Sequence, residues 1–151
     1  MIGLVVTGHL NFATGIRSAL EAVTGLEGQM EFVDYVEDSS DVLERNLSRA
    51  AKAVNHGDGV LFLSDIPGGS PFQKASLVAG TIKEPADVIA GVNLVMAAEA
   101  AMERSELPLE QLVDHVLETG RASLKSLNQA VAEKERAAAV TEPDDFDDNG
   151  I

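Results

Sequence analysis

The amino-acid sequence predicts an α/β protein with a doubly wound, mostly parallel sheet. Short apolar runs typical of strands alternate with segments whose apolar residues recur at helical spacing. The 151-residue chain also has the length of one ordinary domain. Because crossovers between parallel strands are right-handed, few arrangements suit this alternation. We expect the strand order 2-1-3-4, with helices on both faces of the sheet.

Four apolar runs are expected to form the sheet. Residues 2–7 (IGLVVT) are short, unbroken and rich in Val and Ile, which is typical of a buried strand. Residues 30–36 (MEFVDYV) alternate in hydrophobicity, so one side of this strand should be less buried. Residues 59–65 (GVLFLSD) carry the strongest strand signal, and residues 87–92 (DVIAGV) form the fourth run.

Helices are expected between and after these strands. Apolar residues within 12–23 and 43–54 repeat at spacings of three and four residues. After the third strand, Ser70 can cap a helix whose first residue is Pro71, where the missing N–H breaks no hydrogen bond. The remaining helical patterns cover residues 94–105 and 108–120.

The C-terminal part of the chain contains two further segments. Residues 121–131 (RASLKSLNQAV) fit either a last short strand or an extension of the preceding helix. Beyond residue 132 the apolar periodicity disappears and acidic residues outnumber basic ones, which is typical of a mobile tail. We therefore predict a folded domain over residues 1–130 and a flexible acidic tail over residues 131–151.

Composition and charge exclude several classes of function. The net charge of −14 opposes binding to nucleic acid or to an anionic membrane, and suits a partner with a basic face. The chain has no cysteine, so disulfides, thiolate metal sites and cysteine nucleophiles are excluded. No apolar run approaches the roughly 18 residues of a membrane span, and no basic leader precedes the first strand. We expect a protein of the cytosol that is not inserted into a membrane.

Polar residues and glycines follow the first and third predicted strands. In a sheet of this kind, the ligand crevice lies outside the carboxyl ends of the strands, where the strand order reverses. With an order that begins 2-1-3, that point lies between the first and third strands. The residues that meet there are expected to be Gly8, His9, Leu10 and Asn11 on one side, and the run from Asp65 to Ser70, which includes Gly68 and Gly69, on the other.

These residues fit the transfer of a phosphoryl group. A neutral imidazole nitrogen of His9 is a good nucleophile toward phosphorus, and Asp65 can hold the opposite ring nitrogen. The starts of the two helices that follow these strands offer unpaired backbone N–H groups to an anion. Gly68 and Gly69 let the backbone approach that anion closely.

Of the three histidines, only His9 stands at the end of a predicted strand. His56 lies at the end of the second predicted helix beside Gly57, where an imidazole interacts favourably with the helix dipole. His115 falls on the polar side of its helix. Chemistry is therefore predicted for His9 alone.

Other uses of the same residues fit less well. Ser70, His9 and Asp65 could form a hydrolase triad, but the serine lies in no G-x-S-x-G elbow. Asp65 also has the position of the phosphoacceptor in response-regulator receivers, which carry an acidic pair where this chain has TGH. No G-x-G-x-x-G follows the first strand, so a dinucleotide site is not indicated. Too few ligands cluster for a metal site.

Four separated motifs resemble one family over nearly the whole of residues 1–128. The motifs are GLVVTGHLNFATGIRSAL, GVLFLSDIPGGSPFQKAS, VIAGVNLVM and LETGRASLKSL, in this order. Together they are similar to the IIA component of the mannose-type sugar phosphotransferase system. The combination of a Gly-His after the first strand with Asp-x-x-Gly-Gly-Ser-Pro-Phe after the third makes the resemblance specific.

The resemblance implies a function and a site. His9 would accept a phosphoryl group from the phosphocarrier protein HPr and pass it to a histidine of the IIB component for sugar uptake. Asp65 would orient the histidine, and Ser70 would help to bind the phosphoryl oxygens. No metal or organic cofactor is implied. The family also forms homodimers by exchanging a C-terminal antiparallel strand, which assigns residues 121–128 to a fifth strand.

The chain departs from the family pattern at a few positions. Ile66 and Pro67 precede the double glycine where many relatives have an aromatic residue, and Gln73 and Val95 replace other common residues. No IIB domain follows, so the resemblance implies a separate IIB polypeptide. A regulatory module that senses HPr or a metabolite is the alternative function, and the residues do not identify the sugar.

Overall fold

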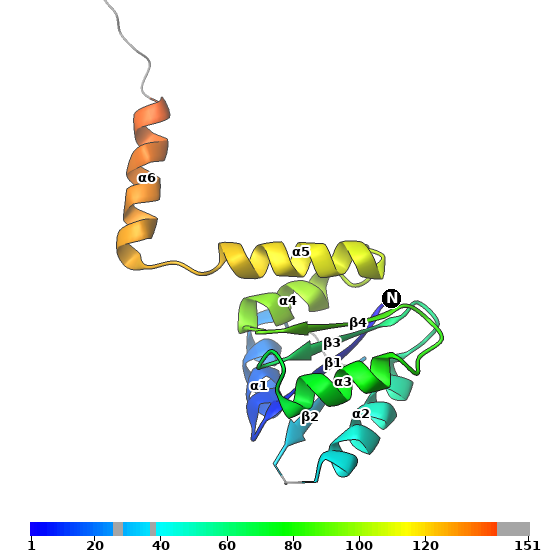
Figure 1. The fold of residues 1–151 in the computed structure, drawn as a ribbon. Coiled ribbons are helices and arrows are strands. Elements are labelled where there is room, and N and C mark those ends of the chain that lie inside the picture. The colour runs from blue at the N-terminus through cyan, green and yellow to red at the C-terminus, as the bar shows by residue number, and fades with distance from the viewer. Residues whose placement is uncertain (26–28, 37–38, 142–151) are drawn as a thin grey trace, which may run out of the picture. The chain divides into compact units, whose positions relative to one another are not determined.

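The computed structural model describes residues 1–25, 29–36 and 39–141 (Figure 1). Contacts divide the chain into two units, Met1–Arg121 and Ala122–Ile151, which are described separately. The first unit contains a four-stranded sheet. The strands are β1 (Gly3–His9), β2 (Met30–Tyr35), β3 (Val60–Ser64) and β4 (Ala86–Ala90).

The sheet has the order β2-β1-β3-β4, as the sequence predicts. All neighbouring strands are parallel, and Thr7 of β1 lies opposite Val33 of β2 and Ser64 of β3. The two central strands are therefore β1 and β3. Their carboxyl ends lie side by side, and this brings the segments that follow them together.

Alternate side chains of β1 point into two separate cores. Leu4 and Val6 pack against the helices on one face of the sheet, whereas Val5 packs on the other face. This alternation follows from the two-residue period of a strand, and explains why β1 is apolar throughout. The first core contains residues of α1 (Phe12–Thr24), α4 (Leu94–Glu103) and α5 (Leu109–Ala122), and the second those of α2 (Ser40–Val54) and α3 (Ser70–Ala79).

The segment assigned to a fifth strand has a different structure. Helix α5 continues to Ala122, and α6 (Leu127–Thr141) begins three residues before the predicted end of the folded domain at residue 130. Residues 121–128 therefore form no strand. The backbone N–H of Gln129 donates to Oγ of Ser126 at 3.1 Å, and the N–H of Ser126 donates to Oε1 of Gln129 at 3.3 Å. This capping box starts a helix where the family resemblance implied a strand.

Helix α6 also covers part of the predicted acidic tail. Residues 131–141 belong to this helix, and residues 142–151 lie outside the described residues. Ala, Glu, Lys and Arg dominate the helical stretch, and these residues favour a helix even without an apolar stripe. Within the described part of the chain, no helix combines the length and the apolar character needed to cross a membrane.

Candidate functional site

His9 and Asp65 meet at the carboxyl edge of the two central strands. His9 is the last residue of β1, and Asp65 directly follows β3. Nδ1 of the His9 ring lies 2.9 Å from Oδ2 of Asp65, and the His9 backbone N–H donates to the same oxygen at 2.7 Å. His9 and Asp65 are 56 positions apart in the sequence, and the parallel pairing of β1 with β3 brings them together. The structure therefore forms the contact that the strand order predicts.

Both oxygens of the Asp65 carboxylate accept hydrogen bonds. Besides the two bonds to Oδ2, the backbone N–H of Ile66 donates to Oδ1 at 2.7 Å. The Asp65 side chain is only 10 % exposed. Burial by itself raises the pKa of this carboxyl, but the hydrogen bonds from His9 and Ile66 outweigh it and hold the pKa below its usual value. Asp65 is thus an ionised acceptor at neutral pH.

The Asp65 carboxylate sets the orientation of the His9 ring. Because an ionised carboxylate only accepts hydrogen bonds, Nδ1 must carry the proton and Nε2 the lone pair. Among the described residues Nε2 has no hydrogen-bond partner, and the His9 side chain is 40 % exposed. The ring of Tyr35 packs edge-on against the imidazole with centroids 6.0 Å apart. The ring is therefore held at Nδ1 and packed against Tyr35, while part of the His9 side chain stays exposed to solvent.

A tight turn connects Asp65 to α3. The N–H of Gly69 donates to the carbonyl of Ile66 at 3.1 Å, Pro67 occupies the second position, and Gly68 has φ +75°. These features match a type II turn, which favours proline and then glycine at its two central positions. Nε2 of Gln73 donates to the carbonyl of Gly68 at 2.9 Å. Ile66, Pro67 and Gln73 together hold this turn.

Gly69 and Gly8 are glycines for different reasons. A Cβ at Gly69 would lie 2.9 Å from Cε1 of His9, so only glycine lets the turn approach the ring this closely. A Cβ at Gly8 would lie 2.4 Å from the Phe12 ring, so Gly8 makes room for core packing. Gly8 therefore has a structural role, whether or not it also contacts a phosphoryl group.

Ser70 begins α3 instead of capping it. Gly69 is the N-cap, because its carbonyl already accepts from the N–H of Gln73 at 2.9 Å. The half-buried Ser70 hydroxyl has no hydrogen-bond partner among the described residues, and in particular none in the His9 ring. The prediction that Ser70 caps the helix was wrong by one residue. The linked Ser-His-Asp arrangement of a hydrolase triad is not assembled in the described residues.

The match to a known family covers most of the chain. Residues 3–117 match the family described as the PTS system fructose IIA component. The chain belongs to this family. It is 35 % identical over 136 residues to the PTS system mannose-specific EIIAB component of Escherichia coli (strain K12), which covers 88 % of this chain and 42 % of that protein. The IIA chain thus spans less than half of that relative.

Other relatives match along nearly their full length. The IIA chain is 26 % identical over 148 residues to the PTS system fructose-specific EIIA component of Bacillus subtilis (strain 168), covering 97 % of this chain and 100 % of that protein. Its fold is similar to the crystal structure of phosphotransferase system component EIIA from Streptococcus agalactiae, with a TM-score of 0.78 and 27 % identity. That match covers 85 % of this chain and 98 % of the other.

Asp34 is a residue near the site that sequence reasoning missed. In the IIA chain, Asp34 at the end of β2 accepts from the Thr14 N–H at 3.0 Å and from the Thr14 hydroxyl at 2.7 Å. Its carboxylate therefore caps α1, where Asn11 makes no side-chain capping bond. Asp34 thus occupies one backbone N–H at the start of α1, whereas no side chain of the described residues caps the start of α3.

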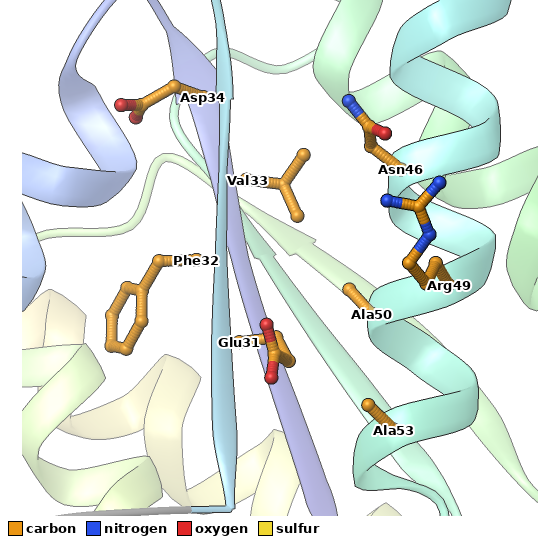
Figure 2. Close-up of a pocket in the computed structure, with 8 residues that line it drawn as sticks. All are labelled: Glu31, Phe32, Val33, Asp34, Asn46, Arg49, Ala50 and Ala53. Carbon is orange, nitrogen blue, oxygen red and sulfur yellow. The ribbon is translucent and has the colours of Figure 1, made fainter.

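The IIA chain also has a groove of about 390 Å³ between β2 and α2. Figure 2 shows Glu31 on the strand and Arg49 on the helix facing this groove, whereas the side chains of Phe32 and Asp34 point to the other side of the strand. Glu31 and Arg49 form no ion pair, and no cluster of three His, Asp or Glu residues suits a metal within the described residues. The groove contains no paired nucleophile comparable to His9.

Proposed function

We propose that this IIA chain carries phosphoryl groups on His9 in a sugar phosphotransferase system of the cytosol. HPr is the donor, and the IIB component is the acceptor that serves sugar uptake. The observation that supports this assignment is the Asp65 carboxylate, which is 10 % exposed, holds Nδ1 of His9 at 2.9 Å and leaves Nε2 without a hydrogen-bond partner among the described residues. An oriented histidine with one free nitrogen is what a transient phosphoryl acceptor requires.

The transfer uses Nε2 first as nucleophile and then as leaving group. Its lone pair attacks the phosphorus of the phosphohistidine on HPr, and a new N–P bond forms while the N–P bond of the donor breaks. The electron pair of the broken bond stays with the HPr imidazole. The His9 ring gains positive charge, which the ionised Asp65 stabilises through Nδ1. Attack by a IIB histidine reverses these steps.

The start of α3 is the proposed site for the phosphoryl oxygens. The first turn of a helix leaves backbone N–H groups unpaired, and in α3 these belong to Ser70 and Phe72, because Pro71 has none. The Ser70 hydroxyl adds a further donor. Gly68 and Gly69 keep the approach to this turn free of side chains. These groups stabilise charge on the phosphoryl group without a metal ion.

We also propose that the chain forms a homodimer, because the family that its motifs resemble forms homodimers. Strand β4 pairs only with β3 and is an edge of the sheet, so one side of it is available to a second chain. Sedimentation equilibrium of the full chain tests this part. A mass equal to one chain at micromolar concentration would exclude the dimer and leave the phosphoryl transfer untouched.

The experiment that tests the transfer uses phosphoenolpyruvate labelled with ³²P, enzyme I and HPr. We expect label on the IIA chain and discharge onto at least one IIB protein from a panel of sugar operons. Nitrogen and phosphorus NMR of the labelled protein should assign the phosphoryl group to Nε2 of His9. Label on another residue, or label that no IIB protein removes, would contradict the proposal.

A further inference from the structure

The residue after His9 has an unusual backbone conformation. Leu10 has φ +49°, in the left-handed region that only glycine adopts at low cost and that bulky residues avoid. Its N–H donates to the carbonyl of Tyr35 at 2.9 Å, and this bond forms an isolated bridge with Tyr35. The surrounding structure therefore imposes the conformation on Leu10.

The Leu10 side chain adds little to the packing of the fold. Leu10 is 67 % exposed and belongs to neither core. Glycine or asparagine would adopt the same conformation with less strain and would expose no large apolar surface. The folded chain alone thus offers no reason for leucine here. A strained residue that persists at a functional site points to a role outside the fold.

A second exposed apolar residue lies close to the His9 ring. Ile66 is exposed at the start of the turn that follows β3. Gly69 lies close to both side chains. A Cβ built on Gly69 would be 2.9 Å from Cε1 of His9 and 3.5 Å from Cβ of Ile66, which shows that the Ile66 side chain starts close to the His9 ring. Leu10, the chain neighbour of His9, and Ile66, whose Cβ lies near the ring, are therefore two exposed apolar residues next to His9, and we call them the apolar rim.

We propose that the exposed side chain of Leu10, held in the left-handed conformation beside His9, is a contact residue for the phosphorylated protein donor. This inference rests on the proposed function and names the surface by which HPr is recognised. A protein donor covers the rim and buries Leu10 when its phosphohistidine reaches Nε2. A small phosphoryl donor reaches Nε2 without touching the rim.

The test compares a protein donor with a small one. The protein donor is phosphorylated HPr, and the small donor is phosphoramidate, whose N–P bond breaks as the phosphoryl group moves to Nε2 and ammonia leaves. Leu10→Asn keeps a residue that tolerates the left-handed conformation but removes the apolar contact. We expect the KM for phosphorylated HPr to rise about tenfold and the labelling rate with phosphoramidate to change less than about twofold.

Two further variants complete the test. The first distinguishes the effect of the Leu10 side chain from the effect of its backbone conformation, and the second is a control. Leu10→Gly relieves the strain, so its unfolding midpoint should rise while its KM for HPr increases as in Leu10→Asn. Val23→Asn is the matched control, because Val23 is also 67 % exposed but lies at the far end of α1, and its KM should stay unchanged.

Several results would overturn the inference. An unchanged KM in both Leu10 variants would show that the side chain is not a contact. An equal loss with both donors would show that Leu10 acts by positioning His9. If neither donor labels the unmodified chain, the proposed function itself fails, and this outcome is distinct because it appears before any variant is compared.

Discussion

Two histidine–carboxylate pairs occur in the described part of the molecule, and only one of them lies at the proposed site. Nδ1 of His9 lies 2.9 Å from Asp65, and Nε2 of His115 on α5 lies 2.9 Å from Glu99 on α4. The two rings are also similarly exposed. Neither the distance nor the exposure of the histidine distinguishes the pairs.

The carboxylates make the difference. The Asp65 side chain is 10 % exposed and accepts two backbone N–H groups, whereas the Glu99 side chain is 25 % exposed and bonds only His115 among the described residues. Asp65 stands at the end of a central strand, and Glu99 lies on a helix surface. A carboxylate fixed by the backbone orients a ring for chemistry, whereas a pair between two helix side chains mainly ties the helices together.

Replacement of each histidine in turn is expected to give the largest difference in phosphoryl labelling between the two pairs. His9→Gln should abolish labelling by phosphoenolpyruvate, enzyme I and HPr, because glutamine offers no nucleophilic ring nitrogen. His115→Gln should be labelled at a rate within about twofold of the unmodified chain. Autoradiography after gel electrophoresis measures both. Label retained by the His9 variant would remove the central hypothesis.

Removal of each carboxylate should give the next largest difference. Asp65→Ala should slow labelling by about a hundredfold with the fold intact, because the ring loses its orientation and the stabilisation of its positive charge. Glu99→Ala should leave the rate nearly unchanged. Rapid-quench kinetics measures the rates, and circular dichroism checks the fold. Equal rates for the two variants would mean that the buried carboxylate has no special role.

A single methyl group at the site should have a smaller effect. Gly69→Ala places a Cβ 2.9 Å from Cε1 of His9, so either the ring or the turn must shift, and labelling should fall about tenfold. Gly15→Ala on α1 is the control, because no atom lies within 4 Å of the new Cβ. This control should be labelled normally and be more stable by about 0.5 to 1 kcal/mol. Normal labelling of the Gly69 variant would show that the site tolerates displacement of the ring.

The pH dependence of stability should show the smallest effect. Folding lowers the pKa of Asp65, so its ionised form stabilises the native state above the ordinary aspartate pKa of about 3.9. This contribution is lost as the pH falls below that value toward the native pKa. The difference in unfolding free energy between the unmodified chain and Asp65→Asn should therefore shrink from about pH 5 to pH 2. Urea unfolding at several pH values measures it, and a constant difference would contradict the lowered pKa.

Several features of the fold and site were predictable from local patterns. The apolar runs and their alternation with helices predicted the strand order, and the position of His9 and Asp65 after central strands predicted their contact. The Pro67-Gly68 pair is itself a turn signal. Each of these features depends either on residues that are neighbours in the sequence or on a strand order that has few alternatives.

Other features depend on contacts between distant segments. Asp34 caps α1 from β2, and no local pattern reveals which carboxylate reaches Thr14. The left-handed conformation of Leu10 follows from its bond to the carbonyl of Tyr35. The Ser126–Gln129 capping box was a local signal for α6, but the family resemblance favoured a strand over the same residues.

By itself the sequence determined the doubly wound fold and the placement of His9 and Asp65 after the two central strands, because hydrophobic periodicity and strand order leave few alternatives. The tertiary structure alone decided which ring nitrogen is free, which helix start remains open to an anion, and why Leu10 is exposed. These properties depend on hydrogen bonds between residues far apart in the chain. Their geometry exists only once β1, β2 and β3 have paired.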